Sequence, residues 1–306
     1  YGQIKQQFNE PREWEDFLLD LHTASGHYKD LLIGDSNAMA NLEEESRNRP
    51  KLLNCLRAFR VLNNKTWIVI FLCLMRNKRS MPKLVKHYKK LERLTFLYFN
   101  IFGLPGNFYH RKLHQVATKI EDMVVEDPNR SKTDYNPVFQ GLWTEIKEKF
   151  PISREPFDEG FLSLRYKAST KGTGLIRYIL SELESHHRVI PGGWDENRVS
   201  IEHIVPQRPA PWGLTVKAVK PFVHSIGNLA FVSNEGNGTM SNKPFEEKFE
   251  TFQGEARSFS LVKDLVEKTN SGDWDFASIT EDNYSVINLR ATHMAQIGWE
   301  VWVKNG

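Results

Sequence analysis

Apolar side chains recur at helical spacing through the first half of the chain. They follow the three-to-four-residue repeat of an amphipathic helix, which buries one face against its neighbours. We therefore expect residues 1–125 to form a mostly helical region whose apolar faces pack on one another. The sets that define the repeat are Trp14, Phe17, Leu18 and Leu21; Leu52, Leu56, Phe59 and Leu62; Leu84, Tyr88, Leu91 and Leu94; and Leu113, Val116, Ile120 and Met123.

The pattern changes in the second half. Residues 126–134 are polar and contain a proline, which indicates a linker or long loop. Later the alternating residues of 199–201 predict a short strand that continues to Pro206, and the apolar run 226–232 predicts a returning strand. The sequence then predicts turns at 233–238 and a helix that starts within 242–249, with proline in its first turn. A compact strand, loop, strand and helix unit is therefore expected at about 199–252.

These elements define a fold class and a domain division. We predict a mainly α-helical protein, with a helical region at 1–125 and a second helical domain at 126–306 that contains the small two-strand and helix unit. The apolar residues at 261–266 predict one closing helix, and those at 283–302 predict a last helix.

Four polar residues of the small unit have the types that phosphodiester hydrolysis requires. A neutral histidine can take a proton from water, so His203 is the candidate general base. Mg²⁺ or Mn²⁺ needs oxygen ligands and keeps several waters, so Glu202 and Asn237 are sufficient as protein ligands. The second ring nitrogen of His203 needs a partner that fixes its orientation, and Asn228 is the candidate.

The same residues carry a family resemblance. Residues 202–206 (EHIVP), 227–229 (GNL), Asn237 and 241–243 (SNK) resemble the ββα-metal (HNH) nuclease signature of GmrSD- and SspE-type modification-dependent restriction proteins. The resemblance is sharpest between 201 and 248. It implies a mainly α fold of a helical bundle with a small ββα-metal (HNH) unit, and a DNA-nicking activity used against phage double-stranded DNA. Segments 91–94, 177–184 and 287–290, with Trp299 and Trp302, also resemble the helical parts of that family.

The chain departs from the family pattern in three places. Glu202 stands where such enzymes often have aspartate, and Asn237 stands where many have histidine. The family also usually carries an N-terminal domain that resembles a ParB-type nucleotidase, and no glycine-rich phosphate loop is present here. Because the sequence begins with Tyr1, we expect a C-terminal portion of a longer protein whose sensor and NTPase domain is missing.

Composition narrows the class of protein but does not identify its function. The hydrophobic fraction of 40% and the length of 306 residues are sufficient for one large or two moderate cores. Only two cysteines occur, which excludes a disulfide framework and indicates a reducing, cytoplasmic setting. The longest apolar run, 67–75, is too short to span a membrane and predicts a buried helix.

Basic residues near the small unit are candidates for contact with nucleic acid. The net charge of +3 is small, so local clustering matters more. The alternative for the segment before the unit is a solvated loop and an ordinary helix surface. We expect Lys248 to be exposed on the helix, and His224 either contacts the backbone of the substrate or makes a structural hydrogen bond. The predicted phosphate-binding residues are Arg165, Lys167, Lys171, Arg177 and Lys243.

Two alternatives to a DNA nuclease fit the same residues. The first is a DNA-binding or partner-docking module whose nuclease motif is inactive. The second is a nuclease that cuts RNA, since the metal chemistry does not by itself distinguish ribose from deoxyribose.

Overall fold

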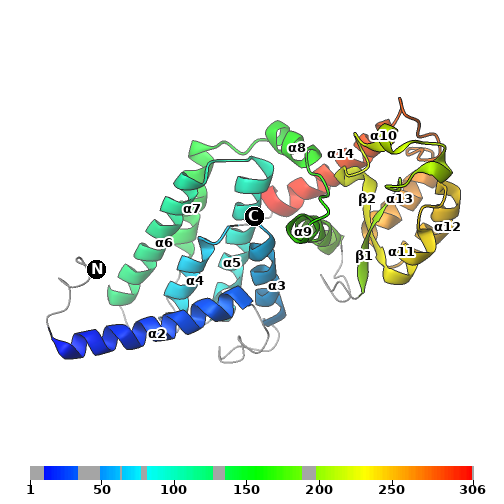
Figure 1. The fold of residues 1–306 in the computed structure, drawn as a ribbon. Coiled ribbons are helices and arrows are strands. Elements are labelled where there is room, and N and C mark those ends of the chain that lie inside the picture. Colours follow the sequence, from blue (N-terminus) through cyan, green and yellow to red (C-terminus); the bar gives the residue numbers. More distant parts are fainter. Residues whose placement is uncertain are drawn as a thin grey trace. The chain divides into compact units, whose positions relative to one another are not determined.

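The protein is mainly α-helical, as the sequence predicts. The computed structural model describes residues 10–33, 49–62, 64–76, 81–126, 135–187 and 198–304, which contain helices and one two-stranded sheet (Figure 1). They form two compact units. Unit 1 comprises Tyr1–Phe99 and Gly103–Pro151, and unit 2 comprises Asn100–Phe102 and Ile152–Gly306. The predicted linker at 126–134 lies almost wholly outside the described residues, so the domain limits 1–125 and 126–306 stay a prediction.

Unit 1 is a helical bundle. The apolar run at 67–75 forms the buried helix α4, and in the described ranges no helix is long and apolar enough to cross a membrane. Helix α4 packs between α2 and α6, while α3 packs on α5 and α6 on α7. The helices of the unit are α2 (Pro11–Ile33), α3 (Arg49–Val61), α4 (Trp67–Arg76), α5 (Met81–Phe96), α6 (Gly106–Glu126) and α7 (Asn136–Lys149). A π-helical turn, η1 (Leu97–Ile101), follows α5, and its last two residues are assigned to unit 2.

Stacked aromatic rings fill the core of unit 1. The ring of Phe71 lies 3.9 Å from that of Tyr88 in a stacked arrangement, and the rings of Phe59 and Trp67 stack at 4.8 Å. Phe71 also meets Phe59 and Trp67 edge to face. All four side chains are buried, so the helices α3, α4 and α5 are joined through one aromatic cluster.

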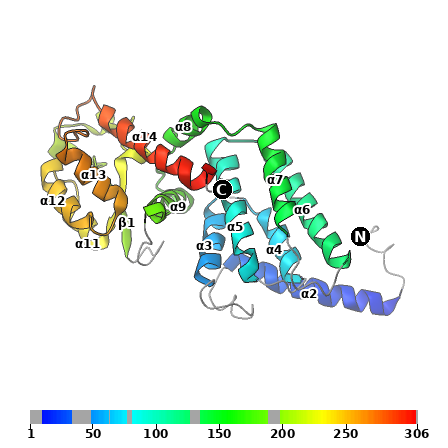
Figure 2. The same ribbon diagram turned by 180° about the vertical axis from the view of Figure 1, so that it is seen from behind.

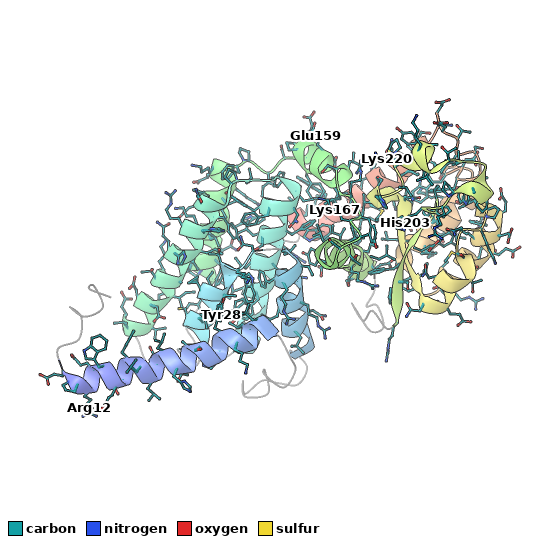
Figure 3. All side chains as sticks on the ribbon, viewed as in Figure 1. Arg12, Tyr28, Glu159, Lys167, His203 and Lys220 are labelled. Atoms are coloured by element: carbon teal, nitrogen blue, oxygen red, sulfur yellow. The ribbon has the colours of Figure 1, made fainter. Side chains whose placement is uncertain are left out.

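The N-terminal half of α2 departs from the predicted packing. Leu18 and Leu21 are 57% and 54% exposed, so the prediction that they face a helical core is wrong. Leu31, near the other end of the helix, is fully buried. Tyr28, labelled in Figure 3, is itself 40% exposed. Helical periodicity predicts which face of a helix is apolar, but the length over which a neighbour covers that face depends on tertiary packing.

Unit 2 is built on the antiparallel hairpin of β1 (Val199–His203) and β2 (Leu229–Ser233). Helices α11 and α13 lie on one side of the hairpin and α9 on the other (Figures 1 and 2). The helices of the unit are α8 (Arg154–Leu162), α9 (Thr170–His187), α10 (Val216–Val219), α11 (Asn234–Met240), α12 (Phe245–Glu255), α13 (Ser260–Asn270) and α14 (Ser285–Trp299), with the short turns η2 (Ala210–Trp212), η3 (Ile226–Asn228) and η4 (Glu300–Lys304).

The ββα order agrees with the sequence, but three boundaries differ. The first strand ends at His203 and does not continue to Pro206. The stretch 233–238, predicted as turns, opens helix α11 because the hydroxyl of Ser233 accepts a hydrogen bond from the amide of Gly236 at 2.9 Å and caps the helix. The second strand begins at Leu229, not at residue 226, since Ile226–Asn228 form the helical turn η3. Asn237 therefore lies on a helix.

The aromatic core generates the first prediction. Phe71→Ala should lower the free energy of unfolding by about 3–5 kcal/mol, because it removes a buried ring and leaves a cavity among three aromatic neighbours. Val125→Ala, at a position 76% exposed, is the matched control and should change it little. Urea denaturation of both variants measures the effect, and an equal small loss would contradict this description of the core.

Candidate active site

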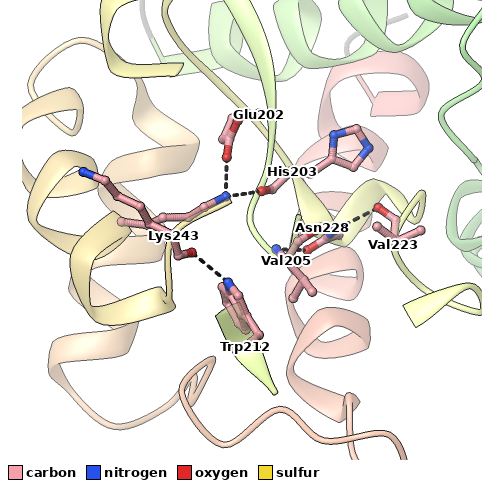
Figure 4. Close-up of polar contacts among 8 residues, drawn as sticks. Glu202, His203, Val205, Trp212, Val223, Asn228 and Lys243 are labelled. Atoms are coloured by element: carbon pink, nitrogen blue, oxygen red, sulfur yellow. Dashed lines mark hydrogen bonds and ion pairs between the residues drawn. The ribbon is translucent and has the colours of Figure 1, made fainter. Parts of the chain in front are cut away.

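Strand β1 carries the candidate metal ligand Glu202 and the candidate base His203 on opposite sides. In the hairpin, Glu202 pairs with Ala230 and His203 pairs with Leu229. Successive side chains of a strand point to opposite faces, so Ser200 and Glu202 share one face and His203 lies on the other. Figure 4 shows the carboxylate of Glu202 and the imidazole of His203 pointing in different directions. The two groups therefore act in separate surroundings although they are neighbours in sequence.

A buried lysine occupies the Glu202 side of the strand. Lys248, from α12, is fully buried, and its ammonium donates to the Glu202 carboxylate and to the main-chain oxygen of His203, the latter at 2.8 Å (Figure 4). The expectation that Lys248 is exposed is wrong. Phe245 and Phe252, three residues before it and four after it, are also buried. That spacing places Lys248 on the inner stripe of the helix, and it is the sequence signal that identifies this residue.

Opposing effects act on the charges of this pair. Burial raises the pKa of Glu202 and lowers that of Lys248, whereas their mutual attraction favours the charged form of each. Two acceptors surround the ammonium, which favours its protonated form. We therefore describe Glu202 and Lys248 as an ion pair that compensates a buried negative charge.

The imidazole of His203 lies between two other side chains. Its Nε2 is 3.3 Å from Nδ1 of His224, and the Tyr166 ring meets it edge to face at 5.1 Å. The residue is 8% exposed. Burial, and then the proximity of His224 and Lys248, lowers the pKa of His203 to about 3. The ring is neutral at physiological pH, which is the form that can accept a proton.

Tyr166 is a component of the site that sequence reasoning missed. Residues 165–166 run beside 224–225: Arg165 forms an isolated antiparallel bridge with Ser225, and the amide of Tyr166 donates to the carbonyl of His224 at 2.8 Å. This pairing is between segments about sixty residues apart. No local pattern in the sequence predicts this pairing, although Tyr166 lies within the basic segment proposed to bind phosphate.

Asn228 has different partners from the one predicted. Its Oδ1 accepts from the amide of Val205 at 2.8 Å, and its Nδ2 donates to the carbonyls of Val205 at 2.9 Å and Val223 at 2.8 Å (Figure 4). The side chain is fully buried. Asn228 thus joins the end of β1 to the loop before β2, and it is His224 that contacts the ring of His203. A role of Asn228 in catalysis stays a prediction.

Helix α14 holds the main chain on both sides of Asn228. The buried guanidinium of Arg290 donates to the carbonyls of Gly227 and Leu229, each at 2.8 Å. Burial lowers the pKa of this arginine to about 10, against the attraction of Asp264 and Glu184. A Cβ at residue 227 would lie 2.1 Å from the carbonyl oxygen of Ile287, so only glycine fits this close approach.

The candidate metal ligands Glu202 and Asn237 both carry side-chain oxygens, the type of ligand that Mg²⁺ prefers. Asn237 is half-buried on α11, and the Ser200 hydroxyl donates to Oδ1 of Asn234 at 2.6 Å. This bond places the first turn of α11 on the strand face that Ser200 shares with Glu202, and Asn237 follows Asn234 by about one turn. Among the described residues no group of three or more His, Cys, Asp and Glu forms a metal cluster, but a magnesium ion that keeps its waters needs fewer ligands.

The five predicted phosphate-binding residues have different surroundings. Lys167 and Lys243 are exposed, and the Lys243 side chain points away from the His203 ring (Figure 4). Arg165 is exposed, but its Nη1 donates to the carbonyls of Leu162 and Leu164 at the end of α8. Arg177 donates to the carbonyl of Val199 at 2.7 Å and so supports β1. The side chain of Lys171 lies outside the described residues.

The fold and the site define a class of domain: a mainly α-helical domain with a ββα unit whose first strand ends in a buried histidine. Residues 152–287 match the model of the GmrSD restriction endonuclease C-terminal domain family. This match includes the residues of the motif and agrees with the resemblance seen there. Comparison with curated proteins gave no match. The resemblance of segments outside 152–287 stays a prediction.

The buried ion pair generates a prediction on stability. Lys248→Met should destabilise unit 2 by about 3–5 kcal/mol, because it leaves the Glu202 carboxylate buried without its counter-charge. The double variant with Glu202→Gln should recover part of this loss, since no charge then remains. Urea-dependent hydrogen exchange of the amides of β1 and α12 measures the change.

An exposed lysine–glutamate pair in the same unit is the control. Lys263 and Glu267 are 60% and 61% exposed, and Lys263→Met should cost at most about 1 kcal/mol. If Lys248→Met and Lys263→Met had the same effect, the buried pair would not stabilise the end of β1.

Proposed function

We propose that this chain is a metal-dependent DNA endonuclease in which His203 is the general base. The observation that supports the proposal most is the position of the His203 imidazole at the end of β1, against His224, inside a segment that matches the GmrSD restriction endonuclease C-terminal domain model. An unprotonated ring at that place in a ββα unit can accept the proton of an attacking water.

The proposed ion is Mg²⁺ or Mn²⁺, held by the carboxylate of Glu202 and the amide oxygen of Asn237. The hydrogen bond between Ser200 and Asn234 supports this pairing, because it directs α11 along the face of β1 that carries Glu202. Both groups are oxygen ligands, the type that these cations prefer. When bound, such an ion supplies positive charge next to the phosphate oxygens on which negative charge develops.

The chain's own residues then perform the proton transfer. With Nε2 of His203 directed at His224, the atom left for water is Nδ1. As the water oxygen bonds to phosphorus, its proton moves to Nδ1 of His203 and the bond between phosphorus and the leaving oxygen breaks. The leaving oxygen then takes a proton from solvent. One such site cuts one strand, so nicking is the elementary activity that we propose, and a double-strand break requires a second event.

Contact with the DNA backbone is proposed for exposed lysines of unit 2. Lys167 follows Tyr166, which packs against the His203 ring, and is the better-placed of the predicted residues. Such contacts are independent of sequence and weaken as salt rises. The match to a restriction endonuclease family supports invading, phage-derived double-stranded DNA as the substrate.

A second candidate function has one observation in its favour. Because Lys248 already compensates the charge of Glu202, the carboxylate attracts a further cation less strongly than an isolated one. A DNA-binding module without metal-dependent cleavage would fit that arrangement. DNA retarded in a gel, without nicking of supercoiled plasmid in Mg²⁺, would favour this function over the nuclease.

His203→Ala tests the general base. The variant should lose plasmid nicking by a factor of about 10² to 10⁴, because no other group then takes the proton of water, while its affinity for DNA stays close to that of the parent. Conversion of supercoiled to open-circular plasmid in Mg²⁺ measures the rate. His114→Ala, at an exposed position of α6, is the control and should nick normally. Full activity of His203→Ala would remove this residue from the role.

Asn237→Ala tests the metal site. Loss of one of two protein ligands should weaken Mn²⁺ binding at least about tenfold, equivalent to about 1.4 kcal/mol. Isothermal titration calorimetry with Mn²⁺ measures the affinity, and Asn270→Ala at the exposed end of α13 is the matched control. An unchanged affinity in Asn237→Ala would show that this amide is not a ligand.

A further inference from the structure

We propose that His224 is the positioning residue of the general base: its Nδ1 accepts a hydrogen bond from the Nε2–H of His203 and so leaves Nδ1 of His203 free for water. The proposal rests on the nuclease function proposed above and assigns a role that the sequence left open. The two nitrogens are 3.3 Å apart, and the ring planes are steeply inclined, at 77°.

The position of His224 is fixed through its main chain. Its carbonyl accepts from the amide of Tyr166 at 2.8 Å, and the next residue, Ser225, bridges to Arg165. The amide of Ser225 donates to the carbonyl of Phe222, and the amide of Asn228 donates to the carbonyl of Ser225. The loop that carries His224 is thus bonded both to segment 165–166 and to the turn before β2, so its ring is held in place before any substrate binds.

Tyr166 completes the enclosure of the His203 ring. Its ring lies 5.1 Å from that of His203 at an interplanar angle of 88°, and 5.7 Å from that of His224 at 31°. The two neighbours restrict rotation of the His203 ring from different directions. Since His203 is 8% exposed whereas His224 is half-buried, His224 is the more exposed member of the pair.

The direction of the hydrogen bond determines which atom can act as base. A neutral imidazole has one N–H and one acceptor nitrogen. If His224 donated to Nε2 of His203, the hydrogen of neutral His203 would sit on Nδ1, and neither nitrogen could take a proton from water. If His203 donates from Nε2, its Nδ1 keeps a lone pair. When that atom is protonated, the bond to His224 becomes charge-assisted and stabilises the new imidazolium.

Kinetics of His224 variants test the proposal. His224→Ala should lower kcat for plasmid nicking about 10- to 100-fold with KM changed by less than about twofold, because orientation of the base is lost and substrate contacts remain. His224→Asn carries an oxygen that can accept from Nε2–H of His203, and should restore part of kcat. Wild-type rates in His224→Ala, or no difference between the Ala and Asn variants, would overturn the positioning role.

Spectroscopy separates this role from the proposed function. Nitrogen-15 spectra of histidine-labelled protein should show His203 in the Nε2–H tautomer, and His224→Ala should give a mixture of tautomers. A dominant Nδ1–H tautomer in the wild type would overturn the inference whatever the activity. Absence of nicking in the wild type would overturn the nuclease function while leaving the tautomer result to decide the hydrogen bond, and His114→Ala serves as the control in both assays.

Discussion

The candidate site depends on the hydrogen bonds and the ion pair that the buried ammonium of Lys248 makes at the end of β1. Lys248 joins α12 to the Glu202 carboxylate and to the carbonyl of His203, so one side chain holds both Glu202 and His203 in place. A buried charge is tolerated only when its partners are close and well oriented. The position of the base is therefore coupled to the packing of α12, whose buried residues Phe245 and Phe252 bring the lysine inward.

Other buried polar groups hold the loops at the same end of the hairpin, where Leu229 of β2 pairs with His203. Asn228 uses both ends of its amide on main-chain groups, and Arg290 takes the carbonyls on either side of it. Glu184 of α9 accepts from the first amides of α13, at Ser260 and Leu261. Each of these buried groups bonds to the backbone. They determine the shape of the loops, and the loops in turn place the rings of His203 and His224.

The sequence predicted what depends on neighbours along the chain. The helical class, β1 and helix α12 were readable from periodicity and from the proline before α12, and the motif around His203 agrees with the family model that matches residues 152–287. The partner of the His203 ring was not readable, because His224 reaches it through a pairing with Tyr166 that is distant in sequence. The burial of Lys248 was readable from the sequence, since its spacing from Phe245 and Phe252 places it on the buried stripe of α12.

Glu202 and His203 point to opposite sides of β1, so the proposed metal ligand and the proposed base lie in different surroundings. Lys248 places a positive charge beside the Glu202 carboxylate, while the rings of Tyr166 and His224 lie against the ring of His203. Burial, and then His224 and Lys248, lower the pKa of His203, while the attraction of Lys248 opposes the rise in the pKa of Glu202 that burial causes. If both groups shared one pocket, the carboxylate would favour protonation of the imidazole and reduce its capacity to accept a proton from water. Separation by a single strand thus keeps the proposed base away from the charge of the proposed metal ligand.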